Sequence, residues 1–149
     1  MAHQTASGVT LGISATAPAT HDTDGFDALT FISVGEITNI GDFGKEWALV
    51  THNPLATRGT KKGKGSYNNG TLSPSLALDP DDSGQAAMET ALESDDPVYI
   101  AVTLQDGTIY YLVGLVMSFK PSIGGVDDVV TATTSIELTP EAILKKAAA

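Results

Sequence analysis

Two apolar runs joined by one tight turn decide the fold of this chain: Val98-Tyr-Ile-Ala-Val-Thr-Leu-Gln-Asp-Gly-Thr-Ile-Tyr-Tyr-Leu-Val-Gly-Leu-Val-Met-Ser-Phe119. Asp106-Gly107 is the strongest short hairpin signal in the sequence, and apolar residues alternate on both sides of it. The stretch therefore predicts a long antiparallel hairpin. Its second strand is expected to place six residues on one face, namely Ile109, Tyr111, Val113, Leu115, Met117 and Phe119.

A helix and a third strand flank this hairpin. Residues 83–93 predict a helix that Asp82 or Ser83 can cap, with Met88 on its apolar face. Residues 126–138 alternate between apolar and polar side chains, which predicts a strand with one dry and one wet face. The wet face comprises Asp127, Thr131, Thr133, Ser135 and Glu137.

Shorter strands are expected at residues 29–40, 46–51 and 71–78, with Gly35 as a bulge or close approach and Trp47 in the core. The fold class is therefore mainly β: a β-sandwich or partial barrel with one flanking α-helix. One domain is expected over residues 28–139, since a chain of 149 residues is of ordinary domain size.

Three segments lie outside the expected core. Residues 1–27 are rich in Ala, Thr, Ser and Gly and predict an extended N-terminal arm, and residues 140–149 predict a C-terminal tail. Residues 52–70 carry many Gly, Lys, Thr and Asn residues and too few apolar ones to offset the entropy of ordering them. This segment is expected to be a long mobile loop.

Charge and composition exclude several classes of protein. The formal net charge of −10 argues against binding nucleic acid through its phosphates, which requires clustered Lys and Arg. The absence of cysteine excludes disulfides, thiolate metal sites and cysteine nucleophiles. The sequence shows no signal-peptide pattern and no apolar run long enough for a membrane span, so a soluble protein made in the cytoplasm is expected.

No motif predicts a metal or cofactor site. Asp79-Pro-Asp-Asp-Ser-Gly84 begins like an EF-hand loop, but its twelfth position is Thr90 where a bidentate Glu is needed. Gly59-Thr-Lys-Lys-Gly-Lys-Gly65 is one residue shorter than a phosphate-binding loop, and no helix follows it. Helix capping explains the first segment better, and a mobile basic loop explains the second.

Catalytic chemistry is not expected either. His3, His21 and His52 lack the paired spacing of metal ligands or general bases, and His21 with Asp22 and Asp24 fits an exposed acidic arm better than a weak metal site. No nucleophile has a base beside it in the sequence. The chain is therefore predicted not to be an enzyme and to need no cofactor.

Several segments taken in order carry a resemblance to a known family. They are Phe31-Ile-Ser-Val-Gly-Glu-Ile37, the Gly/Lys loop, Leu78-Asp-Pro-Asp-Asp-Ser-Gly-Gln-Ala-Ala-Met-Glu-Thr-Ala-Leu92, Gly114-Leu-Val-Met-Ser-Phe119 and Gly125-Val-Asp-Asp-Val-Val-Thr131. Across residues 29–140 the chain resembles the major tail tube proteins of long-tailed, siphovirus-type bacteriophages. Its motifs are structural, so the resemblance rests on their order and spacing.

The resemblance implies a structural subunit of the virion tail, made in the host cytoplasm. Its strands would join with those of sister copies into a hexameric ring barrel, and the rings would stack into a tube that conducts genomic DNA without binding it specifically. If each copy supplied four strands, the ring would close a barrel of about 24, wide enough for an aqueous channel. Tape measure, tail tip and tail terminator proteins are the partners implied, and no membrane is.

Two groups of residues then acquire expected roles. The wet face Asp127, Thr131, Thr133, Ser135 and Glu137 is expected to line the bore as an acidic wall. Contacts between rings are expected from the basic loop and the arm, through Arg58, Lys61, Lys62, Lys64, Val9, Leu11 and Ile13. Two alternatives stay open: a tube protein of a related contractile secretion or gene-transfer particle, and a monomeric immunoglobulin-like binding module.

Overall fold

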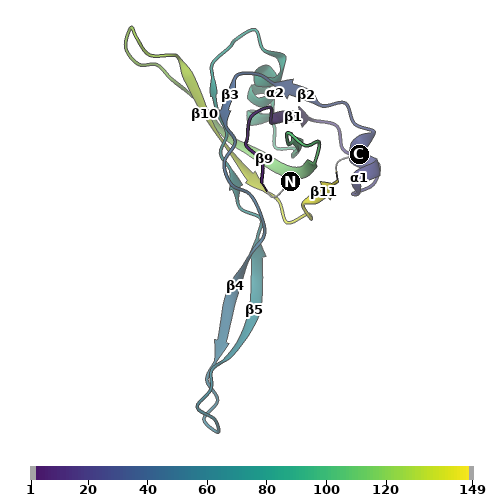
Figure 1. Ribbon diagram of the computed structural model, residues 1–149, viewed down its shortest axis with the longest axis vertical. Helices are drawn as coiled ribbons and strands as arrows, with labels where there is room; N and C mark the ends of the chain where they lie inside the picture. Colours follow the sequence, from purple (N-terminus) through teal and green to yellow (C-terminus); the bar gives the residue numbers. More distant parts are fainter. Residues whose placement is uncertain (1–2, 148–149) are drawn as a thin grey trace.

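Strand pairing gives one nine-stranded antiparallel sheet and a separate two-stranded ribbon within residues 3–147, which are the residues that the computed structural model describes. The sheet has the order β2-β1-β8-β9-β10-β7-β3, with β11 beside β9 and β6 beside β10; the ribbon is β4-β5 (Figure 1). The strands are β1 (Thr10–Ser14), β2 (Ile32–Val34), β3 (Ile37–Asn39), β4 (Glu46–His52), β5 (Lys61–Asn68), β6 (Thr71–Leu72), β7 (Ser75–Ala77), β8 (Val98–Thr103), β9 (Ile109–Ser122), β10 (Thr131–Leu138) and β11 (Leu144–Lys146). The helices are α1 (Thr23–Asp27) and α2 (Ser83–Leu92).

The predicted hairpin is confirmed as β8 and β9. The two strands pair from Val98 opposite Gly114 to Thr103 opposite Ile109, and Gly107 occupies the left-handed region with φ 98°. The expectation of one apolar face along the second strand is wrong, because both faces of β9 are covered. Leu112, Val116 and Phe119 enter the main core, whereas Tyr111 and Val113 enter a second cluster on the other face.

A β-bulge explains how the main core receives both Val116 and Phe119. Ser135 of β10 lies opposite Ser118 of β9, but the next residue, Ile136, lies opposite Val116. Met117 is therefore the extra residue of the bulge, and its side chain is exposed. A one-residue insertion reverses the inward and outward alternation.

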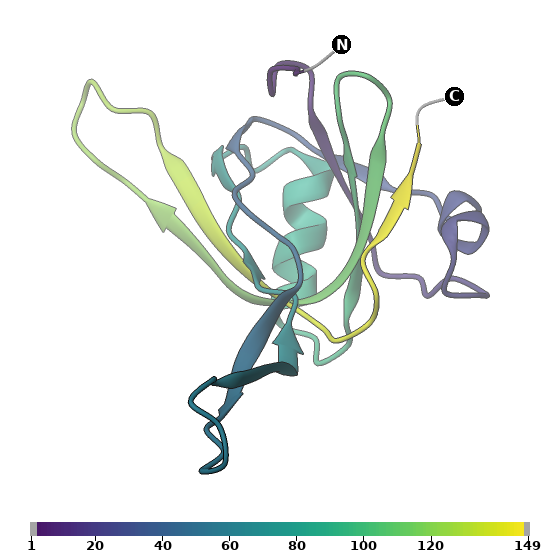
Figure 2. The same ribbon diagram turned by 60° about the horizontal axis from the view of Figure 1, so that its bottom comes forward.

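The sheet curves around α2. β2 and β3 are the two ends of the strand order, yet only Gly35 and Glu36 separate them in the chain. Figure 2 shows α2 inside the curve of the sheet, where it packs against β1, β2 and β9. A Cβ atom on Gly84 would lie 2.3 Å from the carbonyl oxygen of Ser33, so only glycine permits this approach of α2 to β2.

Two polar side chains at the start of α2, its N-cap Asp82 and Gln85, hold the two ends of the strand order together. Asp82 caps the helix, as predicted, and one of its carboxylate oxygens accepts hydrogen bonds from the backbone N–H groups of Gln85 and Gly35. The buried Gln85 amide donates to the carbonyl oxygens of Gly35 and Ala77 and accepts from the N–H of Asp79. The Gln85 side chain thus joins the link between β2 and β3 to the end of β7 by hydrogen bonds.

The expected N-terminal arm is wrong as far as the described residues show, and its residues 1–2 lie outside them. β1 is inserted between β2 and β8, with Leu11 2% and Ile13 3% exposed in the main core and Val9 packed against it. The strand expected at residues 29–40 is two short strands, and the one at residues 71–78 is interrupted at Pro74. β11 lies in the expected C-terminal tail, whose last two residues are not described.

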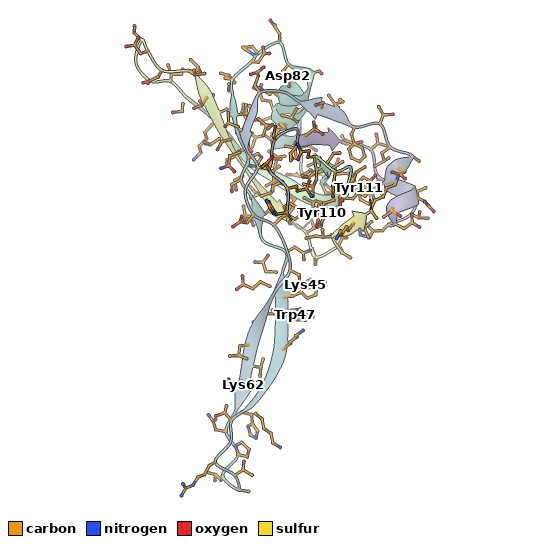
Figure 3. All side chains as sticks on the ribbon, viewed as in Figure 1. Lys45, Trp47, Lys62, Asp82, Tyr110 and Tyr111 are labelled. Atoms are coloured by element: carbon orange, nitrogen blue, oxygen red, sulfur yellow. The ribbon has the colours of Figure 1, made fainter. Side chains whose placement is uncertain are left out.

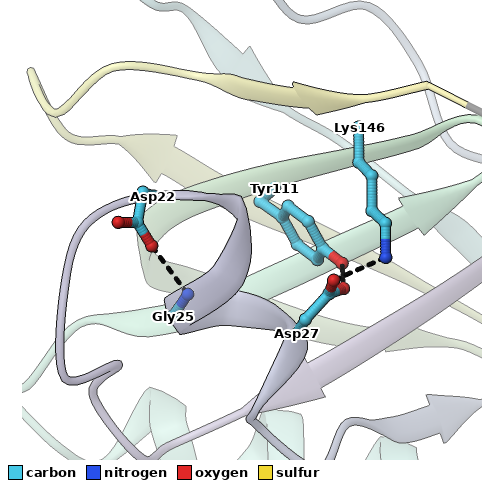
Figure 4. Close-up of polar contacts among 5 residues, drawn as sticks. All are labelled: Asp22, Gly25, Asp27, Tyr111 and Lys146. Atoms are coloured by element: carbon cyan, nitrogen blue, oxygen red, sulfur yellow. Dashed lines mark hydrogen bonds and ion pairs between the residues drawn. The ribbon is translucent and has the colours of Figure 1, made fainter.

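A second apolar cluster covers the outer face of β8 and β9. The helix α1, which the sequence did not predict, places the fully buried Phe26 against Tyr111, with ring centroids 5.0 Å apart. Asp22 caps α1 through the N–H of Gly25 (Figure 4). At the other end of α1, the Asp27 carboxylate accepts a hydrogen bond from the Tyr111 hydroxyl at 2.6 Å and forms an ion pair with Lys146 of β11.

Replacing Gln85 tests the hydrogen bonds that join the two ends of the strand order. We expect Gln85→Ala to lower the free energy of unfolding by about 1–3 kcal/mol, because buried backbone partners lose their hydrogen bonds. Chemical denaturation measures the change. Gln85→Met keeps most of the volume and is expected to be destabilised as well, with the exposed Gln105→Ala as the matched control. A Gln85→Met variant as stable as the wild type would contradict the hydrogen-bond explanation.

The contacts of Asp27 predict an acid-dependent loss of stability. Hydrogen bonding to Lys146 and Tyr111 lowers the pKa of Asp27, whereas burial and the hydrogen bond to Asp27 raise the pKa of Tyr111 well above its usual value, so its hydroxyl stays a donor. A carboxylate whose pKa is depressed by folding adds stability above about pH 4 and loses it as the pH falls through the folded-state pKa.

We therefore expect Asp27→Asn to be less stable than the wild type near neutral pH and to converge with it in acid. Thermal melts across the acid range measure this difference. A difference that stays constant down to low pH would contradict the role given to the ionised carboxylate.

Candidate functional site

Four strands form a layer that is open at both edges, which we call the open sheet. It consists of residues 115–122 of β9, then β10, then β7 with β6 in line, then β3. β8 pairs with β9 only as far as Gly114, so in the described part of the chain residues 115–122 have a strand partner on one side only. β3 ends the strand order and pairs only with β7. Both edges therefore present backbone groups that another strand can pair.

One face of the open sheet is dry and the other is wet, as the alternation in the sequence predicted. Ala132, Thr134, Ile136 and Leu138 of β10 are buried against the core. Thr133 and Glu137 are exposed on the opposite face, where Thr131 and Ser135 are half-buried. The Glu137 carboxylate accepts a hydrogen bond from the Thr71 hydroxyl of β6 at 2.8 Å.

The strand that carries this face is shorter than expected. β10 begins at Thr131, and residues 123–130 form an exposed loop at the end of the β9–β10 hairpin, which we call the tip loop. Asp127 lies in the tip loop, so it does not share the face of Thr131, Thr133, Ser135 and Glu137. The sequence-based prediction that Asp127 lies on this face with the other four residues is therefore wrong.

The wet face is hydroxyl-rich rather than acidic. Residues directly opposite one another on paired antiparallel strands share a face, and one row across the open sheet runs Lys120, Thr133, Ser75, Asn39. Neighbouring rows of β9 and β10 pair Ser122 with Thr131 and Ser118 with Ser135. A further row places Glu137 opposite Leu115 of β9 and Thr71 of β6. Lys120 and Glu137 are the charged members of these four rows, so the expected acidic wall carries one charge of each sign per copy.

The segment expected to be a mobile loop contains a strand. β5 pairs with β4 along its length, and the resulting ribbon projects from the body (Figure 3). Its outermost part, residues 53–60, includes Arg58, whereas Lys61, Lys62 and Lys64 lie on β5 itself. We call residues 45–68 the basic hairpin, because they contain five of the eight Lys and Arg residues and one of the eighteen acidic ones.

Aromatic rings and lysines share one face of the basic hairpin. Trp47 and Tyr67 lie opposite each other with ring centroids 5.0 Å apart. The Lys45 ammonium is 4.4 Å from the Tyr67 ring centroid, and the Lys64 ammonium is 5.4 Å from that of Trp47. Trp47 is 41% exposed, so its expected place in the core is wrong. A two-stranded ribbon with exposed aromatic and aliphatic side chains is marginal alone and suited to covering by a partner.

Val9, Leu11 and Ile13 cannot make the contacts between rings that the sequence predicted for them. Leu11 and Ile13 are buried within their own chain and Val9 is largely covered, so their side chains stabilise the fold of the subunit. Exposed aliphatic residues occur instead in the basic hairpin and the tip loop, at Leu49, Val50, Leu55, Ile123, Val126 and Val129.

The candidate metal and catalytic residues have structural partners. His21 packs edge-on against Phe26 and its ring nitrogen lies 2.9 Å from the carbonyl oxygen of Ala142, and Asp22 and Asp82 cap helices. No three His, Asp or Glu side chains cluster for a metal ion within residues 3–147. Neither described helix is long and apolar enough to cross a membrane.

Comparison with known proteins identifies the fold through solved structures. No protein-family model and no curated protein sequence matches the chain. A chain in the six-fold symmetrised cryo-EM structure of the anti-feeding prophage baseplate matches with a TM-score of 0.73 and 10% identity over 99% of both chains.

Two further solved structures match in the same way. A chain in the sheath/tube terminator of the PVC extracellular contractile injection system, in its extended state, matches with a TM-score of 0.68 and 6% identity over 99% of both chains. The SPP1 tail tube, determined by solid-state NMR and cryo-EM, matches with a TM-score of 0.64 and 16% identity over 93% of this chain and 76% of that one. The chain therefore has the mainly β fold of these phage-tail and injection-system components.

Proposed function

We propose that this protein is the structural subunit of a bacteriophage tail tube. Six copies close into a ring, and the rings stack into a hollow tube through which genomic DNA leaves the capsid. The chain acts in the virion tail after synthesis in the host cytoplasm. Tape measure, tail tip and tail terminator proteins are its further partners in this proposal, as the family resemblance implies, and its role is structural rather than enzymatic.

The open sheet carries this proposal. An unpaired strand edge invites pairing with another chain, and soluble monomers usually cover or interrupt such edges. Here the two edges lie at opposite sides of one layer, so the edge of one copy can pair with the different edge of the next. A head-to-tail interface of this kind builds a ring when its rotation closes. The immunoglobulin-like alternative is disfavoured because the matching solved structures are phage-tail and injection-system components.

The number of strands between the edges fits a wide bore. Each copy contributes four strands, so a hexameric ring would hold about 24, beyond the 16 to 18 that already enclose an aqueous channel. The six-fold symmetrised structure of the anti-feeding prophage baseplate supports the choice of six. In this arrangement the dry face packs on the subunit's own core, and the wet face lines the bore.

The wet face is suited to letting DNA slide. Its serines and threonines offer only neutral hydrogen-bonding groups, and Lys120 is balanced by Glu137 on the same face. Fixed charges act on phosphates only within a Debye length, about 8 Å at physiological salt. A wall without net positive charge gives DNA no reason to adhere, because adhesion comes from displacing counterions with Lys and Arg.

A tube of a contractile particle is the second candidate, supported by the match to the PVC contractile injection system. The SPP1 tail tube match and the sequence resemblance favour the siphovirus-type phage tail. A gene-transfer particle would use the same architecture. Neighbouring genes distinguish these uses, since a contractile particle needs a sheath.

Cross-linking tests how copies join. Because the chain has no cysteine, Asn39→Cys on β3 and Lys120→Cys on β9 can be combined in one clean double variant. Paired strands lie about 5 Å apart, so a short bismaleimide is expected to produce a ladder that ends at the hexamer on a denaturing gel.

Each single-cysteine variant is the matched control and is expected to stay uncross-linked, because the proposed interface joins two different edges. A ladder that stops at the dimer, or equal cross-linking of a single-cysteine variant, would contradict the ring.

A charge change on the wet face tests the bore. We expect tubes of Glu137→Lys to assemble normally and to retain duplex DNA in a salt-sensitive way, because each ring gains a circle of cations. Retention is measured by co-sedimentation of labelled DNA with washed tubes. Glu137→Gln and the α2 variant Glu89→Lys are the controls. Equal retention by Glu137→Lys and Glu89→Lys tubes would argue against Glu137 facing the bore.

A further inference from the structure

The two projections of the molecule leave the open sheet at opposite ends. β10 begins at Thr131, directly after the tip loop, and ends at Leu138. β6, which pairs with β10 at Ile136 and Glu137, directly follows the basic hairpin in the chain. The hairpin therefore emerges beside the end of β10, and the tip loop emerges beside its beginning. Figure 1 shows them at opposite ends of the longest axis.

Charge is divided between these two ends. The tip loop lies beside the loop before α2 and the link between β2 and β3, since Leu78 donates a backbone hydrogen bond to Val130 and Ala77 donates one to Glu36. We call these three segments the acidic end. They contain no Lys or Arg and six carboxylates, namely Glu36, Asp79, Asp81, Asp82, Asp127 and Asp128. The opposite projection is the basic hairpin.

Each end also exposes apolar side chains. Ile123 is 77% and Val129 69% exposed in the tip loop, where Val126 is fully exposed. In the basic hairpin, Leu49 is 67% and Val50 52% exposed. Exposed aliphatic side chains next to charges of one sign are typical of a surface that a partner of opposite sign covers.

We propose that the basic hairpin of one copy docks on the acidic end of a second copy. This inference rests on the proposed function in one respect, in that the second copy belongs to the next ring. Lys61, Lys62 and Lys64 then face carboxylates, while the aliphatic side chains of the hairpin and the tip loop pack together. Because the two surfaces lie at opposite ends of one molecule, the contact does not close and extends as a filament of fixed polarity.

Contacts between two copies of the same end of the molecule would be weaker than this docking. A symmetric contact between two basic hairpins, or between two acidic ends, would bring like charges together at a cost of several kcal/mol. The docking proposed here pairs unlike charges at every joint. It also gives a partner to Glu36, Asp81 and Asp127, which are exposed at the acidic end.

Two charge-reversed variants test the docking. The hairpin variant carries Lys61→Glu, Lys62→Glu and Lys64→Glu, and the end variant carries Glu36→Lys, Asp81→Lys and Asp127→Lys. Native mass spectrometry measures rings, and sedimentation with negative-stain microscopy measures stacked tubes. Each variant alone is expected to form rings but to lose tubes at least about tenfold, because like charges then meet at every joint.

An equimolar mixture of the two variants is expected to restore tubes to near the wild-type amount. In alternating rings the acidic hairpins of the hairpin variant meet the basic ends of the end variant. The unchanged basic hairpins of the end variant likewise meet the unchanged acidic ends of the hairpin variant. The control variant Glu89→Lys, Asp95→Lys, Asp96→Lys makes the same change of net charge as the end variant, but on and after α2, and its tubes are expected to match the wild type.

The docking is overturned if either variant stacks like the wild type, if the mixture of ring-forming variants fails to restore tubes, or if the control loses tubes equally. Absence of rings in the wild type contradicts the proposed function instead. The docking is then tested with single-cysteine chains, Lys62→Cys and Asp127→Cys, which are expected to cross-link to each other at least about tenfold more than to themselves, as unlike charges attract. Equal self-cross-linking would overturn it.

Discussion

Backbone hydrogen bonding at the borders of the open sheet is the constraint on which the rest of this molecule depends. Every strand inside a sheet pairs on both sides, but residues 115–122 of β9 and the strand β3 pair on one side only within the described chain. Covering those borders within one copy would need another strand. β2, the other end of the strand order, also pairs on one side only, but it pairs with neither border. β1, β2 and β8 form the layer on the other side of the core.

The sharing of β9 between two layers makes this arrangement possible. Its first half pairs with β8 and its second half with β10 beyond the end of β8, so one strand of 14 residues belongs to both layers. The bulge at Met117 restores the inward direction of the side chains after the transition, because Val116 and Phe119 both reach the main core. α2 fills the space between the layers, and Asp82 and Gln85 hold the chain where the first layer passes into the second.

Sequence reasoning succeeded where local patterns determined structure. The hairpin turn at Asp106-Gly107, the capped helix after Asp82 and the alternation from Thr131 to Leu138 all followed from short-range rules. It failed where a segment is ordered by distant partners. β1 has the composition of an arm, and only its place between β2 and β8 buries Leu11 and Ile13.

The basic hairpin and the wet face show the same limit. The many glycine and lysine residues at 61–68 disfavour a strand. The one sequence feature that could have indicated it is the aromatic pair of Trp47 and Tyr67, which lie opposite each other on the two strands although twenty residues separate them in the chain. The composition of the wet face could not be foreseen, because Lys120 joins it only through the register of β9 on β10. Of the two acidic residues that the sequence offered for that wall, Glu137 lies on the wet face and Asp127 lies in the tip loop at the acidic end.

A cryo-EM map of the assembled protein would show directly how the strand borders of neighbouring copies meet. We expect closed six-membered rings in which residues 115–122 of one copy pair with β3 of the next, with Glu137 and Lys120 facing the bore. A map of assemblies in which both of these strand borders remain unpaired, or in which copies meet through other surfaces and enclose no channel, would contradict it.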